Sequence, residues 1–205
     1  MIKLTNISVQ FDKKIVVYDL SFSFENKKKY AIMGESGSGK TTILNVIAGL
    51  LKPQSGEVVK DEPCKISYVF QEPRLFNWLT VLENVSIATG LDKTAGEEIA
   101  KKLLKDLGLE ESLYQYPTEL SGGMKQRVSI ARALAYDPDV LLIDEPFKEL
   151  DSETRTKTAD YLFEYCKDKT VIMVTHDIID TYYVDILLKA EVSPISELRM
   201  VKSSI

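Results

Sequence analysis

Two kinds of hydrophobic pattern divide the chain. Over the first 30 residues, apolar side chains recur at about every second position in two stretches, 2–11 and 15–24, which is the period of a strand with one buried face. From residue 30 onward, short unbroken apolar runs each end at a glycine or a polar residue, at Tyr30–Met33, Val140–Ile143 and Val171–Val174. Unbroken runs are typical of parallel strands covered on both faces. The pattern predicts an N-terminal antiparallel β subdomain and an α/β core with a mainly parallel sheet, and we interpret the charged segment Glu25–Lys29 as a hairpin tip.

The middle of the chain carries helical signals instead. Two pairs, Thr80/Glu83 and Thr94/Glu97, fit the capping box,. An apolar face follows at helical spacing, formed by Ala100, Leu103, Leu104 and Leu107,. Gly108 stands where that helix would end,. A further helix is expected from about Ser121 to Tyr136. We therefore predict a single domain over residues 1–205, with 1–71 and 137–205 forming the α/β core and its β subdomain, and with 72–136 forming an inserted helical subdomain.

The composition is that of a globular protein without a nucleic-acid partner. Hydrophobic residues make up 44% of the chain, and its charge sum is 26 − 31 = −5, the opposite of the balance expected for a nucleic-acid binder. No apolar run approaches the ~18 residues of a membrane helix, and the first 30 residues lack a secretory signal pattern,. We therefore expect a cytoplasmic protein, in which Cys64 and Cys166 are reduced packing residues.

The segment Gly34–Thr41 matches the phosphate-binding pattern G-x-x-x-x-G-K-[ST] in full,. Its glycines allow the backbone N–H groups to turn toward anionic oxygens, and a predicted helix from about Lys40 to Leu50 adds its N-terminal dipole. Lys40 supplies a charge for the β- and γ-phosphates, and the Thr41 hydroxyl suits Mg²⁺. The alternative is an ordinary glycine-rich turn.

Three more candidate residues lie at the carboxyl ends of predicted strands, where open α/β sheets bind ligands. Asp144 is suited to hold Mg²⁺, and Glu145 can accept a proton from a water that attacks a γ-phosphate. His176, the single histidine, follows the strand at 171–175. The alternatives are a helix-start Asp-Glu pair and a structural histidine, and the phosphate loop upstream favours the catalytic interpretation.

The segment Leu120–Arg127 contains a second helix start suited to an anion. Ser121, Gly122 and Gly123 combine a hydroxyl, flexible backbone N–H groups and a helix N-terminus,. The alternative is a plain N-cap. Because one nucleotide cannot easily use both helix starts of one chain, this segment predicts a dimer in which each chain covers the nucleotide of the other.

These motifs, in this order and spacing, resemble those of ATP-binding cassette (ABC) transporter ATPases, over residues 2 to about 188. The resemblance implies a P-loop NTPase fold, the cofactors ATP and Mg²⁺, and an ATP-dependent head-to-tail dimer. It also implies permease subunits in the membrane, with this chain peripheral on the cytoplasmic face, and a substrate-binding protein in the complex. Gln71 lies where the family has its Q-loop glutamine, and Phe11 where an aromatic side chain stacks on adenine.

The resemblance also implies a set of site residues. Glu145, His176 and Gln71 would be catalytic, and Thr41, Gln71 and Asp144 would hold Mg²⁺. The nucleotide would be bound by Phe11, Val16, Gly34, Ser36, Gly37, Ser38, Gly39, Lys40, Thr41, Thr42 and Asp151, with Ser121, Gly122 and Gly123 completing the site of the opposite chain.

The segment Phe70–Val85 is most similar to that of nitrate/sulfonate/taurine-type importers, in which Met at position 124 is also common. Three features depart from the family, one of them the lysine-rich turn before Tyr30, where the family usually has Gly-Glu. Lys148 replaces the serine that usually faces the partner subunit, and the chain ends about 30 residues after His176, so we expect the usual C-terminal regulatory tail to be absent.

Several alternatives stay open at this point. An ATPase for lipoprotein release, cell division or macrolide transport shares every nucleotide motif. ABC ATPases that act on DNA or ribosomes need a long insertion or tandem cassettes, and a binding-only cassette would not need Glu145 and His176. Leu75, Phe76 and Trp78 either turn inward as core anchors or line a groove for a helix of the membrane subunit.

Overall fold

The computed structural model describes residues 1–190 and 193–201, which form two compact units. The first contains Met1–Ile66, Asp139–Glu145 and the described residues from Asp168 onward, and the second contains Ser67–Pro138 and Pro146–Lys167. Our prediction placed 1–71 and 137–205 in the core, whereas here 67–71 and 146–167 group with the helical unit. Among the described residues, no helix combines the length and the apolar character needed to cross a membrane.

The first unit begins with an antiparallel sheet of order β2-β1-β4, as the alternating pattern predicted. Its strands are β1 (Ile2–Phe11), β2 (Lys14–Phe24) and β4 (Ser55–Lys60). The hairpin turn lies between Phe11 and Lys14, which face each other in the register.

The interpretation of Glu25–Lys29 as a hairpin tip is wrong. β2 and β3 (Lys29–Gly34) belong to different sheets, so the charged segment carries the chain from one sheet to the other. The reason lies in β3, whose unbroken run Tyr30–Ile32 is buried and needs cover on both faces, which an edge of the small antiparallel sheet cannot provide. Tyr30 anchors the crossing, because its hydroxyl accepts the N–H of Glu25 at 2.8 Å.

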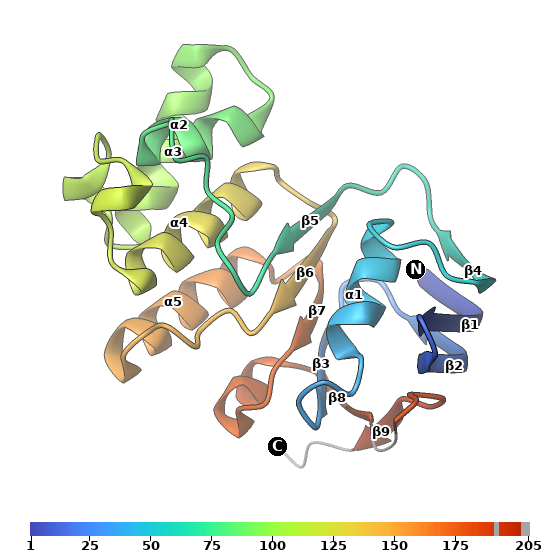
Figure 1. Ribbon diagram of the computed structural model, residues 1–205. Helices are drawn as coiled ribbons and strands as arrows, with labels where there is room; N and C mark the ends of the chain where they lie inside the picture. Colours follow the sequence, from blue (N-terminus) through green and yellow to red (C-terminus); the bar gives the residue numbers. More distant parts are fainter. Residues whose placement is uncertain (191–192, 202–205) are drawn as a thin grey trace. The chain divides into compact units, whose positions relative to one another are not determined.

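The second sheet of this unit is mainly parallel, as predicted, with β3 between β7 and β8. The strands run in the order β6-β7-β3-β8-β9, and only β9 is antiparallel to its neighbour. Figure 1 shows α1 (Lys40–Ala48) between β1 and β2 on one side and β3, β6 and β7 on the other. The strands are β6 (Val140–Asp144), β7 (Thr170–Val174), β8 (Ile186–Ala190) and β9 (Arg199–Val201), with η4 (Ile178–Tyr183) after β7. The carboxyl ends of β3, β6 and β7 therefore meet at one edge, since Val174 pairs with both Ile32 and Asp144.

The second unit is helical and starts with the end of β5 (Ile66–Val69). Its elements are α2 (Val81–Ser86), η1 (Ile87–Thr89), α3 (Lys93–Asp106), η2 (Glu110–Ser112), η3 (Pro117–Glu119), α4 (Gly122–Ala135) and α5 (Ser152–Tyr165). Helices α2, α3 and α4 pack on one another, and their buried apolar faces form the core of this unit.

One of the two predicted capping boxes is confirmed and the other is wrong. Thr80 and Glu83 bond reciprocally at the start of α2. Thr94, however, lies inside α3, because Asp92 caps that helix by accepting the N–H groups of Thr94 and Ala95. Aspartate two residues earlier is the stronger N-cap candidate, and it starts the helix before the threonine. The predicted glycine at the other end of α3, Gly108, has a φ of 68° just after the helix.

Candidate functional site

The phosphate loop joins β3 to α1 and encloses the ammonium group of Lys40. Lys40 Nζ donates to the carbonyl oxygens of Gly34 at 3.0 Å and Glu35 at 2.6 Å, and to Ser38 Oγ at 3.3 Å. The side chain is buried, and this burial lowers the pKa of Lys40, while the charges of Glu145 and Asp144 oppose that shift. A desolvated cation inside a glycine-rich loop at the start of a helix is suited to phosphate oxygens.

Two glycines of the loop adopt conformations that other residues rarely adopt. Gly37 has a φ of 73° and Gly39 a φ of 113°, so both turn the backbone in a way that L side chains resist. A Cβ atom on Gly39 would also lie 2.5 Å from Val16 Cγ1. Val16, predicted to pack near the adenine, thus lies directly against the loop.

A hollow of about 200 Å³ opens beside the loop. Besides the loop residues 35–38, it is lined by Lys14, Ala190 and Ser193. The sequence analysis did not include Lys14. The hairpin register could have indicated it, because Lys14 lies directly opposite Phe11, and such cross-strand partners share one face. Phe11 itself is exposed at the end of β1, as a residue that stacks on a base must be.

Asp144 and Glu145 follow each other at the end of β6 but have different surroundings. Asp144 is buried. This burial raises the pKa of its carboxyl group, while a hydrogen bond with the Thr41 side chain lowers it. Glu145 has a φ of 46°, a left-handed conformation that is uncommon outside glycine and typical of functional turns. Its backbone N–H donates to Val174 O at 2.9 Å, which ties the turn to β7.

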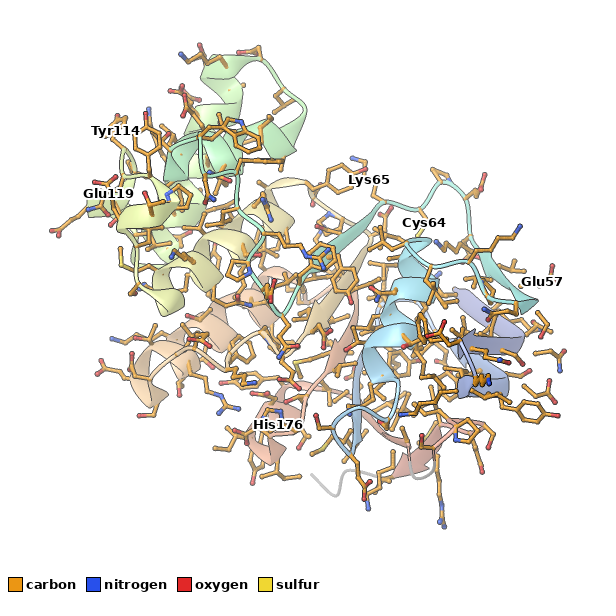
Figure 2. The ribbon with its side chains drawn as sticks, in the orientation of Figure 1. Glu57, Cys64, Lys65, Tyr114, Glu119 and His176 are labelled. Carbon is orange, nitrogen blue, oxygen red and sulfur yellow. The ribbon has the colours of Figure 1, made fainter. Side chains whose placement is uncertain are left out.

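His176 lies beside Glu145. The distance from His176 Nδ1 to Glu145 Oε1 is 3.3 Å, and Figure 2 shows His176 on the segment that follows β7. The parallel order of β6 and β7 explains this proximity, because the two residues leave the same edge of the sheet. Residues 40, 41, 144, 145 and 176, which the sequence analysis selected from three separate motifs, therefore form one cluster.

The cluster fits a magnesium ion that arrives with phosphate. Thr41 and Asp144 offer hard oxygen ligands side by side,. The described part of the chain holds no group of three or more His, Cys, Asp or Glu residues that could hold a metal by itself. A divalent cation held by Thr41 and Asp144 needs further ligands, and Mg²⁺ in nucleotide sites takes them from phosphate oxygens and water.

The remaining predicted site residues belong to the helical unit. Gln71 is exposed on the irregular segment after β5, and Ser121 caps α4 by accepting the N–H of Met124 at 3.3 Å. A Cβ atom on Gly122 would lie 2.9 Å from Glu149 Oε2, and one on Gly123 would lie 3.0 Å from Glu149 O. A side chain at either position would therefore crowd Glu149. Glycine is needed here for packing as well, because it leaves room for the segment that leads to Asp151, the N-cap of α5. The contacts of both glycines with a nucleotide remain predictions.

Comparison with known proteins identifies the family. The ABC transporter family profile matches residues 17–148. The chain belongs to the ABC transporter ATPase family. It is 39% identical to the aliphatic sulfonates import ATP-binding protein of Bacillus licheniformis over 179 residues, which are 83% of this chain and 70% of the relative. It is 38% identical to the ergothioneine transport ATP-binding protein of Helicobacter pylori, over 86% of this chain and 90% of the relative.

A solved structure agrees with this assignment. The ATP-binding cassette MJ0796, in a dimeric post-hydrolysis state bound to ADP and Pi, superposes on this ABC ATPase with a TM-score of 0.91. The sequence identity is 32%, and 98% of each chain is covered. The chain is therefore an ATP-binding subunit of an ABC transporter that hydrolyses ATP, with ATP and Mg²⁺ as its cofactors, and the predicted P-loop NTPase fold is confirmed.

The buried Asp144 of this ABC ATPase leads to a prediction about stability. Burial raises its pKa, so the folded state is favoured while the carboxyl is protonated and loses that advantage as the pH rises through the folded pKa. Without nucleotide, Asp144→Asn should therefore melt above the wild-type protein at pH 7, and the difference should shrink toward about pH 4, the ordinary aspartate pKa. We expect a gain of about 2–4 °C per kcal/mol of relieved desolvation. With MgATP the order should reverse, because the amide loses the metal ligand. An equal or lower melting temperature of the nucleotide-free variant at pH 7 would contradict this account.

Proposed function

We propose that this ATPase powers an importer of a small nutrient, with small organic anions such as aliphatic sulfonates as the substrate class. The observation that carries the proposal is the similarity to curated importer subunits, since relatives named for aliphatic sulfonates import are 36–39% identical to this chain. The segment 70–85, which follows β5, supports the same subfamily. A lipoprotein-release, cell-division or macrolide-type ATPase is the second candidate, and it would share the nucleotide motifs alone.

The proposed reaction is the transfer of the γ-phosphoryl group to water. Lys40 and the loop N–H groups hold the phosphates. The oxygen of the attacking water bonds to the γ-phosphorus while the bond from that phosphorus to ADP breaks, and Glu145 accepts the proton that the water loses. His176, 3.3 Å from Glu145, contacts the γ-phosphate. Mg²⁺, when bound through Thr41, Asp144 and Gln71, supplies neutralisation of the phosphate charge.

We propose that two copies of the chain sandwich two nucleotides. Ser121, Gly122 and Gly123 of each copy then contact the nucleotide of the other, and loss of the γ-phosphate opens the sandwich. The proposed complex contains membrane permease subunits and a substrate-binding protein, and the ATPase is peripheral on the cytoplasmic face of the membrane. The solved relative bound to ADP and Pi is dimeric, which supports the sandwich.

The proposed permease contact lies on the segment 70–80. Phe76 is 37% exposed and Trp78 73% exposed, and their ring centroids are 5.3 Å apart, so these two rings do not both turn into the core. The backbone beneath them is fixed from within the helical unit. The buried Asn84 accepts the N–H of Phe76 at 2.8 Å and donates to Phe76 O and Leu79 O, each at 3.0 Å. Aromatic rings on such a rigid loop suit a hot spot for a partner helix.

Phe76→Ala should separate partner binding from folding. Because the ring is partly exposed and the loop is held through backbone atoms, we expect the melting temperature and the ATPase rate of the isolated subunit to stay nearly unchanged. Co-purification with the permease should be lost. Tyr114→Ala, which removes a ring that is 73% exposed elsewhere on the helical unit, is the control and should leave co-purification intact. A fall in stability of about 3–5 kcal/mol, the size expected for emptying a core aromatic site, would show that Phe76 is structural.

Transport itself is tested by uptake. In a strain lacking this ATPase, uptake of a labelled aliphatic sulfonate should be restored by the wild-type chain and not by Lys40→Ala. Restoration of lipoprotein release or drug resistance, with no effect on sulfonate uptake, would favour the second candidate.

A further inference from the structure

His176 lies on a short turn whose two ends are joined by one hydroxyl group. Thr175 Oγ1 donates to Asp180 Oδ2 at 2.5 Å and accepts the backbone N–H of Asp177 at 3.0 Å. The residue before His176 is therefore bonded both to the residue after it and to the 3₁₀ helix η4. The hydroxyl closes a ring of contacts around the histidine backbone.

The side chains of η4 are arranged against the usual hydrophobic rule. Asp180 is only 3% exposed, and its partner Thr175 is 2% exposed. Ile178, by contrast, is 59% exposed and Tyr182 is 73% exposed. Burying a carboxylate while isoleucine and tyrosine face outward costs free energy unless the carboxylate is hydrogen-bonded. The hydrogen bond from Thr175 offsets part of this cost and so favours this orientation of η4.

The same turn is tied to the strands that carry the other site residues. The Thr175 N–H donates to Ile32 O at 3.3 Å, on the strand that leads into the phosphate loop. The preceding residue, Val174, accepts the N–H of Glu145 at 2.9 Å. The histidine ring itself is largely exposed, so packing does not fix it, and its place beside Glu145 depends on where its backbone is held.

We propose that Thr175 and Asp180 form a positioning pair that holds His176 in its place beside Glu145 for ATP hydrolysis. Neither side chain touches the nucleotide in this account. Their hydrogen bond fixes the backbone of the turn, and the turn aims the imidazole at the γ-phosphate. This inference rests on the proposed roles of His176 and Glu145.

The test replaces the hydroxyl while keeping the shape. Thr175→Val has nearly the same volume but neither donates to Asp180 nor accepts from Asp177. We expect its kcat to fall at least about tenfold, the scale on which misplacement of a reacting group acts, while KM for MgATP changes less than about twofold because the phosphate loop is untouched. Thr175→Ser, which keeps the hydroxyl, should recover most of the rate.

Thr181→Val is the matched control for folding. Thr181 lies in η4 and is buried like Thr175, but its hydroxyl donates to Ile178 O at 2.7 Å, within η4 itself. Thr181→Val should lower the melting temperature about as much as Thr175→Val and leave kcat unchanged. If both valine variants lose kcat in proportion to their loss of stability, the pair is merely structural and the inference is overturned.

A double-mutant cycle separates this inference from the proposed function. If Thr175 acts through the histidine, Thr175→Val should have no further effect on the low residual kcat of a His176→Ala enzyme. A His176→Ala enzyme with wild-type kcat would overturn the proposed role of His176. A strongly lowered kcat of His176→Ala, together with a wild-type kcat of Thr175→Val, would overturn the positioning pair alone.

Discussion

Gly39→Ala should abolish detectable MgATP binding and lower the melting temperature far more than the same change at Gly37. The added methyl would lie 2.5 Å from Val16 Cγ1 and 3.2 Å from Val16 O. Val16 cannot move away easily, because it is buried in β2 and its carbonyl accepts the N–H of Ile195 at 2.9 Å. The loop must therefore change its backbone conformation, which would turn away the N–H groups proposed to bind phosphate.

The glycine at position 37 supplies the matched control. It has a φ of 73°, also in the left-handed region, but a Cβ atom there would meet nothing within 4 Å. We expect Gly37→Ala to cost about 1 kcal/mol, or roughly 2–4 °C, and Gly39→Ala to cost about 3 kcal/mol or more, since overpacking is added to strain. Calorimetry with and without MgATP measures both effects. Val16→Ala should restore part of the stability of Gly39→Ala, and equal losses at both glycines would contradict the steric explanation.

Glu145→Gln should keep MgATP binding and reduce hydrolysis by at least about a hundredfold, the scale of a lost general base. The amide has the shape of the carboxylate but cannot accept a proton from water. Because the γ-phosphate then persists, the variant should accumulate as a dimer with ATP, while the nucleotide-free protein should be a monomer. Light scattering with ATP, with ADP and without nucleotide measures this, and a stable dimer without nucleotide would contradict the sandwich.

The parts of the site that could be predicted from the sequence are those encoded by contiguous segments. The runs 30–33 and 140–143 each combine a buried strand with the residues at its carboxyl end, so strand, loop and chemistry appear together. Parallel pairing then brings Glu145 to His176, 31 positions later in the chain. This proximity could be predicted without any further motif, because the carboxyl ends of parallel strands in an α/β sheet generally lie together at the ligand-binding edge.

The parts that could not be predicted depend on contacts with no local signal. Asp180 reads as a solvated residue among apolar neighbours, and only the fold shows that it turns inward to Thr175. The hairpin interpretation of Glu25–Lys29 failed for a related reason, because a charged turn has the same composition whether it joins two strands of one sheet or of two. The contact of Glu149 with Gly122 joins two motifs far apart in the chain, and spacing alone does not pair them.

Single-turnover hydrolysis tests the central claim most directly, namely that the cluster at the ends of β3, β6 and β7 hydrolyses ATP. Wild-type protein and Glu145→Gln, each in excess over γ-labelled ATP with Mg²⁺, are quenched over time, and free phosphate is separated from bound nucleotide. The account predicts phosphate release by the wild type and retention of intact ATP in the dimer fraction of the variant. Release of phosphate by the variant at the wild-type rate would contradict it.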